Sequence, residues 1–341
     1  MSNLQIIDSG VSVVICCYNS SKVLPKTLEH LSMQIVSDSM NWEVVVIDNA
    51  STDETAETAI RLWKEYGSPT ELSVFQESTP GLSAARKLGT LKSRYETLIF
   101  CDDDNWLCDS YVSKAYEIMK ESSISVCGGE GNAVSDVPLP DWFKKNQRSF
   151  AVGPQANETG SINAYPYGAG MVLRTSVLQK VYQLGFESQL SDRKGKQLSS
   201  GGDGEISEWM AIIGAGNWYF DSALKFDHYI DPERLSLSYL NRLNVGFGQM
   251  TPVIRLYKKC RSRDCPDSFK RFHLLCCAKT AMSLLIAPIR NLKSGNVRLV
   301  MRQQTAQLIW LLRNRKRFIE SGIAIRAMHK TAKQISALPA S

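Results

Sequence analysis

The sequence predicts an α/β fold in which a mostly parallel central sheet is flanked by helices and followed by a C-terminal helical extension. Short apolar, β-branched runs alternate with segments of helical spacing over about the first 120 residues, as βαβ units require. The runs are apolar almost throughout, which is typical of strands buried on both faces. A length of 341 residues is enough for one large α/β domain with an appended piece.

The first half of this pattern contains four predicted strands, each followed by a predicted helix. The predicted strands are 11–17, 42–47, 72–75 and 97–101. The predicted helices are 22–35, 55–66, 82–92 and 109–120, where apolar residues recur close to helical spacing. We expect residues 1–120 to form one half of a larger domain.

The pattern loosens after residue 120. Further strands are predicted at 124–129, 169–174 and 217–226. One helix is predicted to start at Thr175, and another to follow Asp203 and Glu205 and run through Met210. Residues 236–250 and most of 267–335 are predicted to be helical. We therefore expect a domain over residues 1–235, with halves 1–120 and 121–235, and a helical extension over 236–341.

Charge is distributed unevenly between the domain and the extension. Residues 251–341 carry 19 Lys and Arg against 3 Asp and Glu, whereas residues 1–250 carry 21 against 31. This asymmetry predicts an acidic body and a basic tail that contacts an anionic surface. The chain starts without the basic residues and apolar core of a secretory signal, and its nine scattered cysteines are expected to be thiols. A cytoplasmic location follows from both observations.

Carboxylates follow two of the predicted strands. Asp48 and Asp53 come after the second strand, and Asp102–Asp104 come directly after the fourth. Ligands of parallel α/β sheets bind at the carboxyl ends of strands, and converging carboxylates suit Mg²⁺ or Mn²⁺. If the strand stays extended, alternation gives Asp102 and Asp104 the same facing and turns Asp103 away. The alternative is that these aspartates only cap a turn or a helix.

Four segments give this chain a specific resemblance to a known family. They are Val13–Asn19, Val44–Asp53, Gly81–Lys87 and Leu98–Asp104. In this order and spacing they resemble family 2 glycosyltransferases of the GT-A fold, over roughly residues 10–110. A weaker resemblance continues through Tyr167–Met171, Gly202–Glu205 and His228–Arg234.

The resemblance implies a set of residues that bind a nucleotide-diphospho-sugar donor. These are Tyr18, Asn19, Asp48, Arg86, Asp102 and Arg234. The first two would border the base and ribose pocket, Asp48 would accept a hydrogen bond from the base, and Asp102 would hold the ribose. Arg86 would contact the nucleotide or brace the acidic edge, and Arg234 would face the leaving diphosphate.

The resemblance also implies a divalent cation, Mn²⁺ or Mg²⁺, held by Asp104 and by the late His228. Imidazole suits Mn²⁺ better than Mg²⁺. Asp203 is expected to be the general base that takes the acceptor hydroxyl's proton. The family usually has an acidic pair at this point, but here Gly202 precedes Asp203, so Glu205 is an alternative base.

The C-terminal extension has three interpretations. The basic run Arg313–Arg317 follows the apolar Leu308–Leu312, a combination that suits an interfacial helix on anionic lipid. The run could instead be a solvated extension packed on the core. Nucleic-acid binding would rest on charge alone, with no accompanying motif, and is not expected. The apolar segment 272–289 is expected to be buried or to lie at an interface rather than to span a membrane.

These observations predict a metal-dependent, inverting transferase that moves one sugar from a nucleotide-diphosphate donor to a glycan or lipid-linked acceptor. Surface polysaccharide biosynthesis on the cytoplasmic face of the membrane would suit a basic peripheral tail. Processive family members usually carry several membrane spans and a Q-x-x-R-W stretch, and neither occurs in these residues. The alternatives are a nucleotidyltransferase, which would show a Gly-rich basic loop after the first strand, and a non-catalytic sugar-nucleotide-binding protein, which the change to Gly202 favours.

Overall fold

The computed structural model describes residues 8–190, 201–213, 216–262, 265–291 and 297–336. The chain divides into two compact units, the first made of residues 1–183 and 215–232 and the second of 184–214 and 233–341. This grouping differs from the boundary predicted at residue 235. Residues 184–214 group with the C-terminal helices because helix α7 (Gly202–Ile212) packs on helix α8 (Leu237–Arg261), where the rings of Trp209 and Tyr257 meet edge-on at 5.6 Å.

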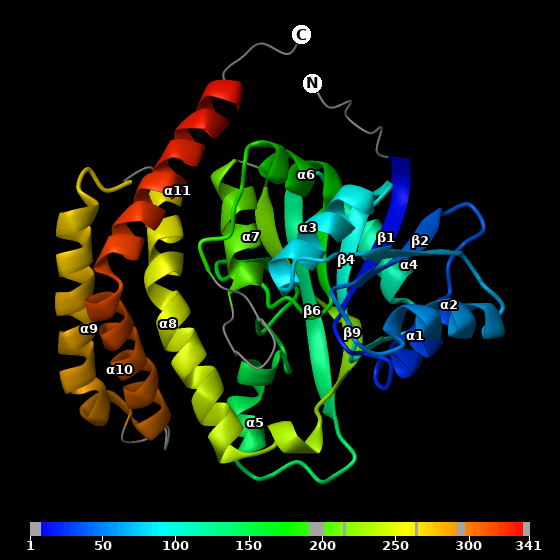
Figure 1. Ribbon diagram of the computed structural model, residues 1–341, viewed down its shortest axis with the longest axis horizontal. Coiled ribbons are helices and arrows are strands. Elements are labelled where there is room, and N and C mark those ends of the chain that lie inside the picture. The colour runs from blue at the N-terminus through cyan, green and yellow to red at the C-terminus, as the bar shows by residue number, and fades with distance from the viewer. Residues whose placement is uncertain (1–7, 191–200, 214–215, 263–264, 292–296, 337–341) are drawn as a thin grey trace. The chain divides into compact units, whose positions relative to one another are not determined.

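The first unit is built around a nine-stranded sheet among the described residues. The strand order is β3-β2-β1-β4-β8-β6-β9-β5, and β7 pairs with β9. Figure 1 labels β1, β2, β4, β6 and β9 of this sheet. The strands are β1 (Asp8–Cys17), β2 (Trp42–Asp48), β3 (Glu71–Gln76), β4 (Tyr95–Asp102), β5 (Asn105–Leu107), β6 (Ile124–Val134), β7 (Gly160–Ile162), β8 (Met171–Arg174) and β9 (Asn217–Tyr229).

The sheet is parallel in its first half and mixed in its second. The pairs β1–β2, β1–β4 and β2–β3 are parallel, as the alternation of strands and helices predicts. Beyond β4 the pairs β4–β8, β6–β8, β5–β9 and β7–β9 are antiparallel, and only β6–β9 is parallel. The predicted α/β class with helices on a central sheet is confirmed, and the parallel arrangement holds for the part that sequence alternation covered.

Six α-helices and a short 3₁₀-helix accompany this sheet in the described part of the first unit. They are α1 (Leu24–Ser32), α2 (Thr55–Glu65), α3 (Leu82–Lys92), α4 (Tyr111–Met119), α5 (Phe143–Asn146), η1 (Gln147–Phe150) and α6 (Thr175–Gln183). The core lies where the apolar side chains of β1 and β2, such as Val13, Ile15 and Val44, are fully buried. Helix α3 packs very close to β1 at Gly89. A Cβ at this position would lie only 2.4 Å from Val14 Cγ1, so a larger residue would not fit without a shift.

The second unit is helical. It consists of α7 (Gly202–Ile212), α8 (Leu237–Arg261), α9 (Phe269–Asn291), α10 (Val297–Arg313) and α11 (Arg315–Ser336). Helix α10 lies between α8 and α9 (Figure 1). The side chain of Ser236 caps α8 by accepting a hydrogen bond from the backbone N–H of Tyr239. The predicted helical extension is therefore confirmed, and α8 continues eleven residues past the predicted end at residue 250.

Two cysteines depart from the expectation of thiols throughout. Cys260 and Cys265, whose Cα atoms are 4.0 Å apart, are joined as a disulfide. The other seven cysteines are free. Cys260 and Cys265 lie on either side of the end of α8. In the sequence they have no second cysteine pair with which to form a zinc site, and nothing there indicated that they are joined to each other.

Candidate functional site

The carboxyl edge of β1, β2 and β4 brings the acidic loops together. In the sheet register Cys17 is the partner of Asp48, and Cys16 is the partner of Asp102. Adjacent strands lie about 4.8 Å apart, so the two carboxylates flank the end of β1 on either side. Asp48 is buried and accepts a hydrogen bond from the backbone N–H of Ser51 at 3.2 Å. Both carboxylates therefore lie at the carboxyl edge of the sheet, as expected for residues at the ends of parallel strands.

The loop after β1 is tied to the loop after β2 by Asn19. The backbone of Asn19 is left-handed (φ 54°), and its side-chain oxygen accepts hydrogen bonds from the N–H and hydroxyl of Thr52 at 2.8 and 3.2 Å. Asn19 therefore joins the two loops, and its side-chain oxygen is engaged by the protein. The ring of Tyr18, by contrast, is 51% exposed beside this edge, where it can contact a base.

Asp103 holds the acidic turn in place. Its side chain accepts a hydrogen bond from the hydroxyl of Ser20, and its carbonyl accepts one from the hydroxyl of Thr27 at 2.6 Å. Burial, with the charge of Asp104 second, raises the pKa of Asp103 to about 7. These contacts give Asp103 a positioning role that the sequence did not reveal, and its separation from nucleotide and metal stays a prediction.

Asp104 reaches His228 through a strand that the sequence did not predict. β4 ends at Asp102 and the next two residues form a turn, so alternation along one strand does not set the direction of Asp104. Instead, the short β5 pairs antiparallel with β9 and places Asn105 opposite His228. The backbone N–H of Tyr229 also donates to the carbonyl of Asp104 at 2.9 Å. As a result, His228 Nε2 lies 3.3 Å from Asp104 Oδ1.

The Asp104–His228 pair fits one side of a cation site. Ligands about 2.1 Å from a metal and at right angles to each other lie about 3 Å apart, close to the observed 3.3 Å, which is also hydrogen-bonding distance. The buried Nδ1 of His228 has no hydrogen-bond partner among the described residues. No group of three His, Cys, Asp or Glu side chains that could hold a metal occurs in the described ranges.

Asn105 is a residue that sequence reasoning missed. It is fully buried beside Asp104, and neither polar atom of its amide has a hydrogen-bond partner among the described residues. Buried amides are nearly always hydrogen-bonded. An unpaired amide next to the carboxyl edge therefore suggests that a bound ligand supplies its hydrogen-bond partner. Its place directly after three aspartates was the available signal.

Arg86, on helix α3, is buried against the sheet rather than exposed to solvent. It is only 4% exposed, and its guanidinium carbon stands 5.3 Å from the ring centre of Phe100. Phe100 belongs to β4, the strand that ends in the acidic turn. Of the two roles predicted for Arg86, this position favours bracing the acidic edge.

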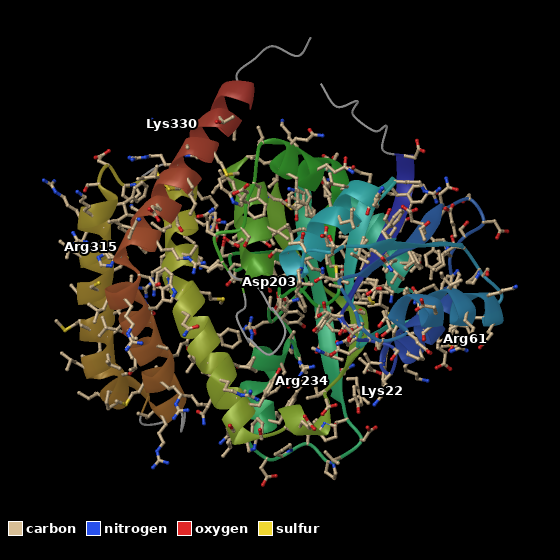
Figure 2. The ribbon with its side chains drawn as sticks, viewed as in Figure 1. Lys22, Arg61, Asp203, Arg234, Arg315 and Lys330 are labelled. Carbon is tan, nitrogen blue, oxygen red and sulfur yellow. A yellow bond between two sulfur atoms is a disulfide. The ribbon has the colours of Figure 1, made fainter. Side chains whose placement is uncertain are left out.

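Asp203 lies in the first turn of α7 (Figure 2). It is partly exposed, and its Oδ1 accepts a hydrogen bond from the backbone N–H of Gly204 at 2.8 Å. Gly201, which precedes the helix, has φ +119°, a conformation that L side chains rarely adopt. Asp203 is thus presented at a helix start that glycine makes possible.

Glu205, the alternative base, is committed to the protein interior. Its Oε1 accepts hydrogen bonds from the N–H of Gln189 at 2.9 Å and the hydroxyl of Tyr257 at 2.7 Å, and its Oε2 accepts from the hydroxyl of Ser188 and the N–H of Leu190. The side chain is fully buried, which raises its pKa to about 7. With its lone pairs occupied and no exposed surface, Glu205 suits a structural role, and the comparison favours Asp203 as base.

Replacing Tyr257 with phenylalanine tests this structural role. At pH 8, where Glu205 is ionised, loss of the hydroxyl should lower the free energy of unfolding by about 1.5–3 kcal/mol, the worth of a hydrogen bond to a charged group. At pH 5.5, below the pKa of about 7, Glu205 is protonated and the loss should shrink to about 1 kcal/mol. Urea unfolding at both pH values measures the difference. Tyr66→Phe, whose hydroxyl has no hydrogen bond to a described residue, is the control, and equal losses in the two variants would contradict the role.

Arg234, Asp203 and Glu205 belong to the second unit, whereas the carboxyl edge belongs to the first. Arg234 ends the short 3₁₀-helix η2 (Pro232–Arg234), and its guanidinium carbon lies 5.7 Å from the ring centre of Tyr239. The structure brings together Asp48, Asp102, Asp104 and His228. The placement of Asp203 and Arg234 against a donor bound there stays a prediction.

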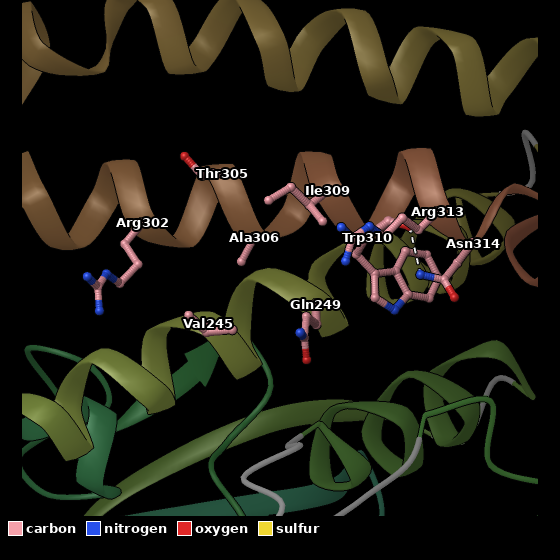
Figure 3. A pocket seen from close by; sticks show the side chains of 9 residues that line it. All are labelled: Val245, Gln249, Arg302, Thr305, Ala306, Ile309, Trp310, Arg313 and Asn314. Carbon is pink, nitrogen blue, oxygen red and sulfur yellow. Dashed lines mark hydrogen bonds between the residues drawn. The ribbon is translucent and has the colours of Figure 1, made fainter.

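A cavity of about 510 Å³ lies within the second unit, between α8 and α10. It is lined by Val245, Gln249, Arg302, Thr305, Ala306, Ile309, Trp310, Arg313 and Asn314. Figure 3 shows Arg302 toward one end and Arg313 toward the other, with Ile309 and Trp310 on the α10 side. Two cations beside an apolar wall suit a ligand that is both anionic and apolar.

Comparison with known proteins places the first unit in a family. The family model described as "Glycosyl transferase family 2" matches residues 12–182, half of the chain. The matched range contains the loops of Asp48 and of Asp102–Asp104, and it ends before Asp203 and His228.

Individual relatives match over shorter stretches. Glycosyltransferase GlyA of Streptococcus pneumoniae is 27% identical over 126 residues, which are 37% of this chain and 17% of that protein. Dolichyl-phosphate beta-glucosyltransferase ALG5A of Trichomonas vaginalis is 34% identical over 99 residues, or 28% of this chain and 30% of that protein. This chain therefore spans less than a third of the length of either relative.

Solved structures resemble this chain over nearly its whole length. The structure of S. aureus TarS 1-349 in complex with UDP has a TM-score of 0.50 and 17% identity, and the match covers 94% of this chain and 91% of that one. The complex of the same protein with UDP-GlcNAc has a TM-score of 0.50 and 16% identity, over 94% and 92% of the two chains. At such identities the likeness shows a shared fold.

Proposed function

Because this chain belongs to glycosyl transferase family 2, we propose that it transfers a single sugar from a nucleotide-diphospho-sugar donor to a glycan or lipid-linked acceptor. The observation that carries the proposal is the carboxyl edge of the sheet. There Asp48 and Asp102 flank β1, and Asp104 lies 3.3 Å from His228. A carboxylate for the base, one for the ribose and an oxygen–nitrogen pair for a cation are the groups that such a donor requires.

The proposed reaction is metal-dependent. Asp104 and His228 would hold Mn²⁺ or Mg²⁺, which when bound supplies positive charge to the leaving diphosphate. Asp48 would accept a hydrogen bond from the base and Tyr18 would cover it, while Asn19 and Asp103 keep the two loops in place.

The proposed stereochemistry is inversion by direct displacement. Asp203 would take the proton of the acceptor hydroxyl as that oxygen forms its bond to the anomeric carbon, while the bond from that carbon to the diphosphate breaks. A partly exposed carboxylate at the start of α7 suits this task better than Glu205, which is buried and fully hydrogen-bonded. Arg234 would steady the leaving diphosphate.

The acceptor is proposed to be a glycan or a lipid-linked molecule, and the proposed location is the cytoplasmic face of the membrane. Support comes from the 19 Lys and Arg against 3 Asp and Glu in residues 251–341, and from the α8–α10 cavity that combines two arginines with an apolar wall. Surface polysaccharide biosynthesis would use an enzyme of this kind at the membrane.

A thermal-shift screen of donors tests the proposed function. UDP-sugars come first, because TarS has been solved with UDP and UDP-GlcNAc. A donor at 100 times its Kd should add about 2.7 kcal/mol to the free energy of unfolding, and more of this gain should appear with Mn²⁺ than with EDTA. The best donor should then give sugar transfer or slow donor hydrolysis. If nucleoside triphosphates bind instead and release pyrophosphate, the chain is a nucleotidyltransferase; binding without any turnover would indicate a non-catalytic protein.

A further inference from the structure

Helix α9 is apolar, yet little of it is buried within the second unit. Its Phe269–Ile289 segment is the one helix, among the described residues, that is long and apolar enough to cross a membrane, with a mean hydropathy of 1.6. Core helices of soluble proteins are also apolar enough to pass this test, but they are mostly buried. Here only 22% of the segment is buried, so burial in a core does not explain its composition.

The outward face of α9 is apolar. Its most exposed large residues are Leu274 (61%), Leu275 (55%), Met282 (60%), Leu285 (74%) and Ile289 (74%). At 100° per residue these positions fall within one stripe about 100° wide. We call this set the α9 stripe. An apolar stripe of this length on the outside of a helix is a surface that water does not favour.

The inward face of α9 includes polar side chains that are hydrogen-bonded to α10. The hydroxyl of Thr280 accepts a hydrogen bond from Gln307 at 2.7 Å, and the hydroxyl of Ser283 accepts one from Gln304 at 2.8 Å. His273 Nε2 lies 2.9 Å from the carbonyl of Leu311. These hydrogen bonds therefore help to hold α9 against α10, whereas Leu274, Leu275 and Leu285 lie on the exposed side.

We propose that the α9 stripe is the surface that inserts into an anionic lipid bilayer, with the helix lying in the plane of the interface. This inference rests on the membrane-surface part of the proposed function and names the residues responsible. It differs from the expectation that the basic run Arg313–Arg317 makes the contact. The basic residues then attract the chain to the surface, and the stripe supplies the apolar contact.

Charge complementarity identifies lipid as the occupant. Exposed cations lie at the N-terminal end of the stripe, at Lys270 and Arg271, and at its edge, at Lys279. No Asp or Glu occurs anywhere in Phe269–Asn291 or in Val297–Arg313. An apolar stripe with cations at its margin and no acid nearby is the pattern of an interfacial helix on anionic lipid.

Insertion is one-sided rather than spanning. Figure 1 shows α9 running alongside α10 in the second unit, and the two are joined by the hydrogen bonds of Thr280 and Ser283. If α9 spanned the bilayer, α10 would be drawn into the hydrocarbon with it. Gln304 and Gln307 of α10 would then lie in hydrocarbon, where polar side chains are costly. An in-plane helix buries the stripe and leaves the face that is hydrogen-bonded to α10 on the protein.

Vesicle binding by a stripe variant tests the proposal. The full chain carrying Leu274→Gln and Leu285→Gln is compared with the wild type on vesicles of phosphatidylcholine with phosphatidylglycerol. Burying two leucines supplies enough transfer free energy that their loss should lower the partition coefficient about a hundred-fold. Wild-type binding should also persist at high salt, whereas residual binding of the variant should disappear with salt, because screening removes only the charge contribution.

The matched control is Ile35→Gln with Ile60→Gln, two residues of the first unit that are 66% and 58% exposed. It should bind vesicles as the wild type does. Equal partition coefficients for the two double variants would overturn the proposal. So would sedimentation velocity showing a wild-type dimer that the stripe variant abolishes, because a second copy would then cover the stripe.

These outcomes are independent of the proposed function. Vesicle binding is measured without donor or acceptor, so a chain that transfers no sugar can still bear out the stripe. Conversely, transfer to a soluble acceptor by a stripe variant that binds vesicles normally would retain the enzyme and discard the insertion surface.

Discussion

Replacing Asp104 with alanine is expected to lower kcat/KM for sugar transfer by about a thousand-fold. A bound cation stabilises developing charge by several kcal/mol, and each 1.36 kcal/mol is a factor of ten in rate. His228 alone, with one nitrogen, would hold the cation poorly. Steady-state transfer assays with the best donor, across a range of Mn²⁺ concentrations, measure the loss.

Two further variants make this result specific. Asp109→Ala changes an exposed aspartate five residues along the chain and should leave transfer unchanged. His228→Ala should lower activity in the same direction as Asp104→Ala and weaken the dependence on Mn²⁺. Unchanged turnover in Asp104→Ala at every Mn²⁺ concentration would contradict the role given to the acidic turn.

Replacing Asp203 with asparagine is expected to lower kcat by about 10²–10⁴-fold, the usual contribution of a general base. Donor binding, measured by thermal shift, should be unchanged, because Asp203 would act on the acceptor. The N–H of Gly204 can still donate to the asparagine oxygen, so the start of α7 should stay folded. Full transfer activity in this variant would remove Asp203 from the mechanism.

Two carboxylate changes separate catalysis from folding at this helix. Glu187→Gln alters an exposed acid of the same unit and should change neither activity nor stability. Glu205→Gln places an amide N–H₂ against donors such as Leu190 N–H, so it should destabilise the second unit. A stable, folded Glu205→Gln variant that loses only kcat would make Glu205 the base.

The sequence predicted the first half of the sheet well because its strands are strongly apolar and regularly spaced. The strands that contain Val13, Val44 and Phe100 all lie where the pattern places them, and α3 (Leu82–Lys92) has the predicted bounds. The facing of Asp48 and Asp102 follows from the same regularity, because parallel strands end at one edge.

The Asp104–His228 contact depends on elements that carry little sequence signal. β5 has three residues, too few for any alternation to be recognised, yet it pairs with β9 and sets the direction of Asp104. The resemblance to the family named His228 as a ligand, and β9 was predicted in part, but the pairing of β5 with β9 could be found only in three dimensions.

The roles of Glu205 and α9 were hidden for a similar reason. Hydrogen bonds from Ser188 and Tyr257, which come from opposite sides of Glu205 in the sequence, turn that residue into a buried structural group. For α9, apolar composition was visible in the sequence, but which face points outward depends on its hydrogen bonds to α10.

Mn²⁺ binding in the presence of UDP tests most directly whether Asp104 and His228 hold a cation with the donor diphosphate. Electron paramagnetic resonance reports free Mn²⁺, so a titration of the wild type, Asp104→Asn and His228→Gln gives the affinity of each without requiring turnover. Our account predicts one site whose affinity rises with UDP and falls at least about ten-fold in each variant, the lower end of losses seen when a metal site is perturbed. Equal Mn²⁺ affinity in all three proteins would contradict it.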